Sequence, residues 1–306
     1  MDAASLKPAV LRRCSPPAAW EAFFLIGIFP AGSSLKWTKV QLFSGGRTPG
    51  RHCVSALEAM DGTIGEELIL FGHENGVEEV RRKLPRETFD RSRDGWGLRT
   101  ETGLDWQGTW PSLTLTSREP GFVARTRSRD VLWWIHMQPV LSYWGVFGSL
   151  EFEKNGSRHT GLGIVEHAWG GEVPFDPGRL SPGRWQWDVL AFEDGTACAG
   201  LATSLFGRNL GLRSGGTAPG TAFQYGRGMK VRVSEWEILD GRRTPSIWKG
   251  TMMLGPRRFD YEARRSTPPA PVLPQGGFMG FGFEGRWRDA PGRTFAGTGF
   301  TEFRAA

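Results

Sequence analysis

One short pattern occurs twice in this chain, first as Gly161-Leu162-Gly163-Ile164-Val165-Glu166-His167 and again as Gly297-Thr298-Gly299-Phe300-Thr301-Glu302-Phe303. Both copies read Gly-x-Gly, an apolar residue, a spacer, Glu and a ring, and they begin 136 residues apart. Repeat units of solenoids run at about 20–50 residues, so this distance is too long for a solenoid. It fits two similar domains placed end to end, as does the length of 306 residues at roughly 150 residues per domain.

The composition favours many short strands over long helices. The chain holds 43 Gly and 20 Pro, which break secondary structure often, and 14 Trp and 20 Phe, which bury large areas. Strands that recur every 8–12 residues with turns between them are typical of β-barrels and β-sandwiches. We therefore predict an all-β fold.

Local patterns place several of these elements. Asn155-Gly156, Asp194-Gly195 and Asp240-Gly241 each separate two apolar segments and predict hairpin turns. The apolar run over residues 22–29 is too short to span a membrane and is interpreted as a buried first strand, with a signal peptide as the alternative. Two short helices are predicted near residues 55–60 and 76–84. The Pro- and Gly-rich stretch 170–183 predicts the domain boundary.

Charge and cysteine content narrow the function classes. The net charge is +6, but the basic residues are scattered and no nucleic-acid motif accompanies them, so we expect no nucleic-acid partner. Three well-separated cysteines form no Cys-x-x-Cys, which favours a reducing compartment. We expect a cytoplasmic protein without a membrane span, with secretion the less favoured alternative.

The residues around the first copy carry a family resemblance. The order Ser142-Tyr143-Trp144, Gly148-Ser149-Leu150 and Glu166-His167-x-Trp169-Gly170, followed by Trp185-x-Trp187-Asp188, resembles the hydroxyneurosporene synthase (carotenoid 1,2-hydratase) family and its AttH-like relatives. The second copy, Gly297-x-Gly299-Phe300-x-Glu302, resembles the C-terminal motif of that family. The match runs from about residue 113 to residue 303, and the segment before it departs from the pattern.

The resemblance implies a fold and a substrate class. It implies two consecutive lipocalin-like antiparallel β-barrels, which we assign to residues 35–175 and 176–306 after an N-terminal segment of residues 1–34. It also implies a hydrophobic small-molecule substrate, since the superfamily includes hydratases and enzymes of pericyclic cyclisation. The sequence leaves open whether the barrel cavity serves hydration, isomerisation or cyclisation of a polyene, terpenoid or polyketide, or whether the protein is a non-catalytic lipid or pigment carrier.

Three ionisable residues are candidates for proton transfer: Glu166, His167 and Asp188. Adjacent strand residues point to opposite faces, so Glu166 and His167 cannot both enter one barrel without a bulge. His167 is the stronger candidate of that pair, because Glu302 repeats Glu166 while Phe303 replaces His167 in the second copy. Asp188 could protonate an alkene, although most such strand carboxylates are structural or solvated.

Aromatic residues are the candidates for holding an apolar ligand by packing and cation–π attraction, with ordinary core packing as the alternative. They are Trp133, Trp134, His136, Tyr143, Trp144, Trp169, Trp185 and Trp187. No metal-ligand spacing, phosphate-binding glycine loop or nucleophile elbow occurs. We therefore expect neither a metal nor a cofactor, and the oligomeric state stays open.

Overall fold

The structure is a computed structural model of the 306-residue chain, and it is built from β-strands. It describes residues 20–46, 63–83, 96–109, 111–137, 141–170, 185–205, 208–217, 224–226, 228–255, 257–272, 278–288 and 292–304. None of these residues lies in a helix long and apolar enough to cross a membrane.

The chain divides into two compact units. Unit 1 comprises residues 1–27, 38–70 and 79–175, and unit 2 comprises residues 28–37, 71–78 and 176–306. The last change from unit 1 to unit 2 along the chain comes between residues 175 and 176, within the Pro- and Gly-rich stretch that predicts a domain boundary. Unit 2 also holds two short segments from the first half of the chain, which the sequence pattern does not foresee.

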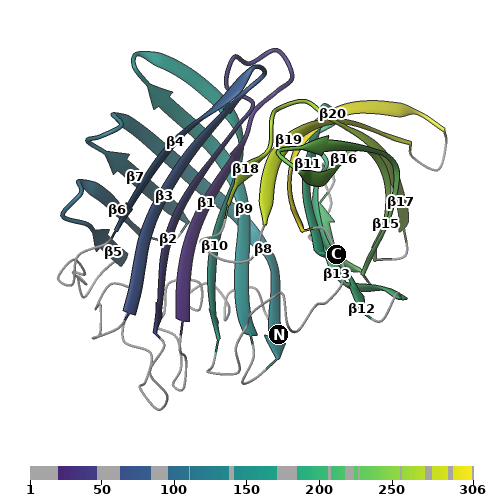
Figure 1. The fold of residues 1–306 in the computed structure, drawn as a ribbon, viewed down its shortest axis with the longest axis horizontal. Coiled ribbons are helices and arrows are strands. Elements are labelled where there is room, and N and C mark those ends of the chain that lie inside the picture. Colours follow the sequence, from purple (N-terminus) through teal and green to yellow (C-terminus); the bar gives the residue numbers. More distant parts are fainter. Residues whose placement is uncertain are drawn as a thin grey trace. The chain divides into compact units, whose positions relative to one another are not determined.

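Each half of the chain forms one curled antiparallel sheet (Figure 1). The strand order of the first sheet is β4-β3-β2-β1-β10-β9-β8-β7-β6-β5. Its strands are β1 (Trp20–Ile28), β2 (Trp37–Gly46), β3 (Thr63–His73), β4 (Gly76–Lys83), β5 (Trp96–Arg99), β6 (Leu104–Thr109), β7 (Ser112–Ser117), β8 (Phe122–Met137), β9 (Leu141–Lys154) and β10 (Ser157–Gly170).

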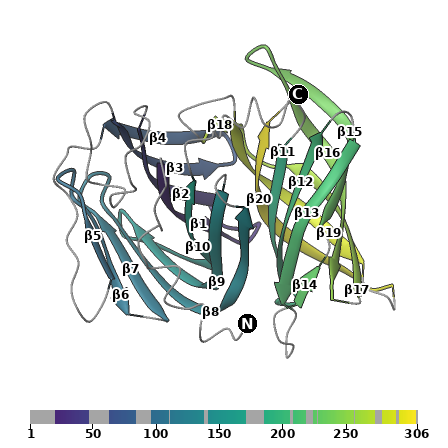
Figure 2. The same cartoon turned by 90° about the horizontal axis from the view of Figure 1, so that it is seen from below.

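The strand order of the second sheet is β14-β13-β12-β11-β20-β19-β17-β16-β15, and β18 pairs with β19. The sheet curls until β13 and β14 pack against β15 and β16 (Figure 2). Its strands are β11 (Trp185–Phe192), β12 (Ala197–Leu205), β13 (Arg208–Thr217), β14 (Gln224–Gly226), β15 (Met229–Leu239), β16 (Arg242–Leu254), β17 (Arg257–Arg265), β18 (Ala270–Pro271), β19 (Met279–Arg288) and β20 (Thr294–Arg304).

The two copies of the repeat occupy the same place in the two sheets. β10 carries the first copy and lies between β1 and β9, and β20 carries the second and lies between β11 and β19. Each is thus the last strand of its sheet and pairs with the first. The predicted all-β fold of two consecutive lipocalin-like antiparallel β-barrels is confirmed.

Local signals for turns and for the first strand also hold. Asn155 and Gly156 have φ values of 51° and 78°, and Asp240 and Gly241 have 49° and 73°, so each pair lies in the left-handed region that two-residue hairpin turns require. The apolar run over residues 22–29 is buried in and just after β1. The interpretation of this run as a buried first strand is therefore confirmed.

The helix predicted near residues 76–84 is wrong. Residues 76–83 form β4, which pairs with β3 at the edge of the first sheet. Pairing with β3 satisfies the hydrogen-bonding groups of its backbone, while the side chains of Glu78 and Glu79 remain exposed. The helix predicted near residues 55–60 lies outside the described residues.

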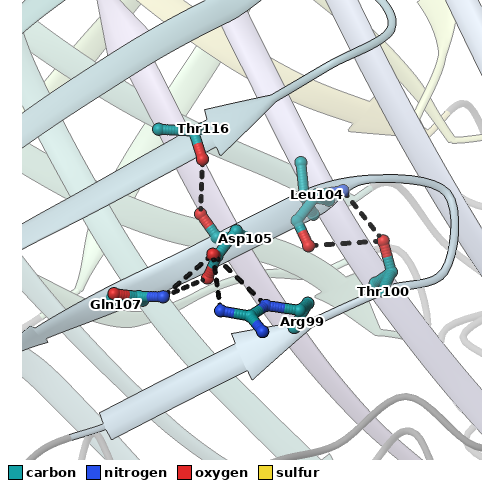
Figure 3. Close-up of polar contacts among 6 residues, drawn as sticks. All are labelled: Arg99, Thr100, Leu104, Asp105, Gln107 and Thr116. Atoms are coloured by element: carbon teal, nitrogen blue, oxygen red, sulfur yellow. Dashed lines mark hydrogen bonds and ion pairs between the residues drawn. The ribbon is translucent and has the colours of Figure 1, made fainter.

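Polar side chains protect the other edge of the first sheet. Asp105 on β6 accepts hydrogen bonds from Arg99 Nη2 on β5 at 3.2 Å and from Gln107 Nε2 at 2.8 Å (Figure 3). Thr100 Oγ1 accepts a bond from the Leu104 amide in the same hairpin at 3.1 Å. Arg99 is largely exposed. Charges of this kind on an edge strand disfavour pairing with another chain, so we read this cluster as structural.

Candidate functional site

The candidate site lies in the interior of unit 2, and strand alternation on β11 creates it. Gln186, Asp188, Leu190 and Phe192 share one face of β11, and Leu190 and Phe192 belong to the buried core of the unit. Asp188 therefore points into an apolar interior, and its side chain is 0% exposed. Directly opposite it lie Thr301 on β20 and Gly200 on β12.

Four side chains donate hydrogen bonds to the Asp188 carboxyl group. Oδ1 accepts from Thr301 Oγ1 at 2.5 Å and from Gln186 Nε2 at 3.0 Å. Oδ2 accepts from Tyr261 OH at 2.5 Å and from Trp248 Nε1 at 2.9 Å. The donors come from β11, β16, β17 and β20, so strands on different sides of the curled sheet converge on one carboxyl group.

A glycine makes room for the Tyr261 ring. Tyr261 lies opposite Gly250 in the β16–β17 pair, and a Cβ atom at residue 250 would come within 2.0 Å of the phenol carbon that bears the hydroxyl. Because real Cβ atoms do not approach so closely, only glycine permits this ring position. Gly250 therefore lets the Tyr261 hydroxyl reach Asp188.

Burial and charge set the protonation states of the cluster. Loss of water raises the pKa of Asp188 above its ordinary value, although the four hydrogen bonds pull in the other direction. Burial, and then the neighbouring Asp188 charge, raise the pKa of Tyr261 well above its ordinary value. Tyr261 therefore stays a neutral donor at neutral pH, while Asp188 is shifted towards its acid form.

The thiol of Cys198 also lies buried in this core. Burial and then the Asp188 charge raise its pKa well above the ordinary value. A thiol that keeps its proton is a poor nucleophile. We therefore give Cys198 a packing role.

The structure places His167 and Glu166 in unit 1, on opposite faces of β10. His167 shares its face with Gly163, which packs against Leu150 and Thr126 in the interior of the first sheet. The His167 side chain is 0% exposed and stacks on the Phe23 ring, with 4.3 Å between centroids and 5° between planes. Glu166 is buried on the other face.

Of the three predicted acid–base residues, His167 and Glu166 thus lie on different faces of one strand, as alternation requires. Asp188 lies in the interior of the other unit, and its four donors all belong to that unit. The sequence favours His167, whereas the geometry favours Asp188, because four hydrogen-bond donors converge on its fully buried carboxyl group.

The predicted ligand-binding aromatics divide into two groups. The side chains of Trp133, Trp134, His136, Tyr143, Trp144 and Trp169 lie outside the described part of the structure, although their backbone belongs to β8, β9 and β10. Trp185 and Trp187 share the face of β11 that points away from Asp188. Trp187 is 4% exposed, and Trp185 is half-buried with an edge-on contact to Phe278 at 6.0 Å.

Sequence reasoning missed the partners of Asp188. Tyr261, Trp248 and Gln186 lie outside the repeat, and Thr301 fills its variable spacer position. Alternation along β11 does place Gln186 on the same face as Asp188, but Tyr261 and Trp248 meet Asp188 only through the curl of the sheet. Among the residues that the structure describes, no three His, Cys, Asp or Glu side chains group as a metal site would require.

Comparisons with known proteins point to the fold. No model of a protein family matches the chain, and no curated protein matches it by sequence. A crystal structure of a candidate AttH protein from Nitrosomonas europaea is similar, with a TM-score of 0.65 and 10% identity over 95% of this chain and 97% of that one. Kievitone hydratase from Nectria haematococca has a TM-score of 0.59 and 10% identity over 94% of this chain and 89% of that one. At this identity the likeness shows a shared lipocalin-like fold.

Proposed function

We propose that this protein is a cofactor-independent enzyme that protonates a carbon–carbon double bond of a hydrophobic substrate, with hydration as the overall reaction. The observation that carries the proposal is the Asp188 carboxyl group, which is fully buried and bonded to four side chains. The family resemblance and the fold shared with a hydratase support the reaction class.

The surroundings of Asp188 suit an acid that acts on an apolar molecule. A carboxyl group whose pKa is raised by burial holds its proton closer to neutral pH, as a general acid must. Buried rings lie close by, since Trp248 packs edge-on against Phe283 at 5.0 Å and Phe281 at 5.9 Å. Aromatic faces stabilise a neighbouring cation, so they would lower the energy of a carbocation formed there.

In the proposed reaction, the Asp188 O–H bond breaks and its proton forms a C–H bond with one alkene carbon. The other alkene carbon becomes cationic, and Asp188 is left as a carboxylate that Tyr261, Trp248, Thr301 and Gln186 stabilise by donation. Water then bonds to the cation and returns one proton to Asp188, so that the net change is addition of water. Loss of a different carbon-bound proton from the same cation would give isomerisation.

A carrier of lipid or pigment would use an interior of the same shape without turnover. A buried carboxyl group with four donors favours catalysis over carriage, because a charge-capable group lowers the affinity for a purely apolar guest. A pericyclic cyclisation would need the shape of the interior but no acid. Replacing the acid therefore separates these alternatives.

The remaining candidate residues keep subordinate proposed roles. His167 and Glu166 are candidates for proton transfer in unit 1, and Trp133, Trp134, His136, Tyr143, Trp144, Trp169, Trp185 and Trp187 are candidates for substrate contact. The variant His167→Ala tests the first role. Loss of product with ligand binding retained within about tenfold would support it, and unchanged turnover would remove His167 from the mechanism.

The proposed function is tested by incubation with a panel of alkene-containing terpenoids, polyenes and polyketides in D₂O, followed by mass spectrometry. Wild-type protein should place deuterium on carbon and add one water to a substrate of the panel. Asp188→Asn should lose both signals, while Asp260→Asn, which changes an exposed aspartate of the same sheet, should keep them. Equal deuterium incorporation by Asp188→Asn would refute the role of Asp188.

A further inference from the structure

The interior of unit 2 has two unlike ends. At one end, stacked rings close it: Phe259 lies 4.4 Å from Trp287, and Trp287 lies 5.1 Å from Phe295, between ring centroids. Phe192 adds an edge contact to Phe259 at 5.3 Å. Asp188 lies further along the strands, because its partners Tyr261 on β17 and Thr301 on β20 both come after Phe259 and Phe295.

The opposite end is covered by the β15–β16 hairpin. The register of this pair shifts at Val233/Glu235 and again at Glu235/Trp236. Because an extra residue in a strand reverses the faces of the residues after it, Trp236 points to the same inner face as Val233. Its ring lies 5.8 Å from that of Phe303, close to the end of β20, and the Arg243 guanidinium lies over the Trp236 ring, 4.5 Å from its centroid. A hairpin whose register shifts twice thus forms the cover at this end.

Arg265 lies beneath this cover. It follows Phe259, Tyr261 and Ala263 on the inward face of β17, and its side chain is only 12% exposed. Arg265 Nη2 forms an ion pair with Glu237, which is carried by the same hairpin and is half exposed. Arg265 Nη1 is buried, and no acceptor for it lies in the described part of the chain.

Arg265 Nη1 is buried without a hydrogen-bond acceptor in the described residues, so the guanidinium can bind one more anionic group. Burial of an unsatisfied donor is costly, and Arg matches carboxylate and phosphate groups through two parallel hydrogen bonds. Glu237 uses one side of the guanidinium. An entering anion can use the other side, or displace Glu237 and with it loosen the hairpin.

We propose that Arg265 binds an anionic head group, carboxylate or phosphate, of the substrate whose double bond reaches Asp188. This inference rests on the proposed function and names the substrate class: an amphipathic chain with one acidic end. Tyr261 and Arg265 are four residues apart on one strand, which places the two sites about 13 Å from each other at ~3.3 Å per residue. Between them on the inward face of β17 lies Ala263, whose side chain is short.

The test is a binding measurement on the full chain with three probes of one hydrocarbon chain: oleate, oleyl phosphate and oleyl alcohol. Wild-type protein should bind at least one of the two anions at least tenfold more tightly than the alcohol, and the two anionic probes distinguish carboxylate from phosphate recognition. Arg265→Gln should remove the preference for the anion and leave the alcohol affinity within about threefold. Arg264→Gln, at the adjacent exposed position, is the matched control and should change neither affinity.

Two outcomes would overturn the inference: equal wild-type affinity for anion and alcohol, or an equal loss of both affinities in Arg265→Gln. If Arg265→Gln does not fold, the variant Glu237→Gln tests the proposal instead. It removes the ion pair of the Arg265 guanidinium and should tighten anion binding severalfold. Unchanged or weaker anion binding would contradict the proposal. Head-group preference is measured without turnover. Anion binding through Arg265 without deuterium incorporation at carbon would therefore contradict only the proposed function. Deuterium incorporation without an anion preference that depends on Arg265 would contradict only this inference.

Discussion

The two copies of the repeat lie in equivalent strands, β10 and β20, but the buried side chains on these strands and on their partners β1 and β11 differ. In unit 1, the buried His167 lies on the last strand and stacks on Phe23 of the first strand. In unit 2 the last strand has Phe303 at the matching position, and the buried carboxyl group of Asp188 lies on the first strand. The last strand thus carries a histidine in one sheet and a phenylalanine in the other, and Asp188 lies on the strand that pairs with the second of these.

This difference separates what the fold requires from what a site requires. The repeated glycines serve the fold: a Cβ atom at Gly299 would lie 2.2 Å from the Phe283 ring, and one at Gly163 would lie 3.1 Å from Leu150 and Thr126. Glu166 recurs as Glu302, whereas Phe303 replaces His167 and Asp188 lies outside the repeat. Close packing of the last strand therefore accounts for the glycines that the two copies share.

The largest expected effect comes from removing the ionisable group of each unit in turn. Asp188→Asn should lower turnover about 10²–10⁴-fold, the usual contribution of a general acid. His167→Phe gives the first copy the residue of the second, and should lower turnover less than Asp188→Asn does. Steady-state kinetics on the substrate found in the D₂O screen make the comparison. A greater loss for His167→Phe would move the chemistry to unit 1.

A smaller effect is expected from the glycine that admits Tyr261 to the Asp188 cluster. Gly250→Ala should lower the free energy of unfolding by about 1–3 kcal/mol, because the new methyl group meets the phenol ring and overpacks the interior. Thermal or urea unfolding measures this change. Gly285→Ala is the matched control, since its Cβ atom would meet only ordinary contacts, the nearest at 3.4 Å. Equal stability of the two variants would show that the Tyr261 position is not fixed by Gly250.

The smallest effect concerns the pH dependence of stability. The folded protein holds the Asp188 proton to a higher pH than the unfolded chain, because burial raises the pKa of this group. Its contribution to stability is therefore largest below the unfolded pKa of about 4 and declines as pH rises towards the folded pKa. Asp188→Asn should remove this decline. Urea unfolding of both proteins across pH 4–8 measures it, and parallel curves would mean that Asp188 is ionised like an ordinary aspartate.

The sequence predicts the fold well and the site only in part. Alternating strands, turn pairs such as Asn155-Gly156 and the repeat are local or periodic signals, so they predict strands, hairpins and duplication. Asp188 was among the predicted residues because a carboxyl group could protonate an alkene. Its partners Trp248 and Tyr261 lie 60 and 73 residues away in sequence, and only the curl of the second sheet brings them to one carboxyl group. The wrong helix prediction for residues 76–84 has a similar cause, because pairing with β3 makes this segment a strand.

The most direct test of the Asp188 assignment needs no substrate: ¹³C NMR of protein labelled at the aspartate carboxyl carbons, titrated between pH 3 and pH 8. The Asp188 signal is identified by its loss in Asp188→Asn. We predict that this carboxyl group titrates above the ordinary aspartate value of about 4, because burial raises its pKa, and that its signal moves when Tyr261 is changed to Phe. A midpoint at or below pH 4 would contradict a buried neutral acid and remove the basis of the proposed reaction.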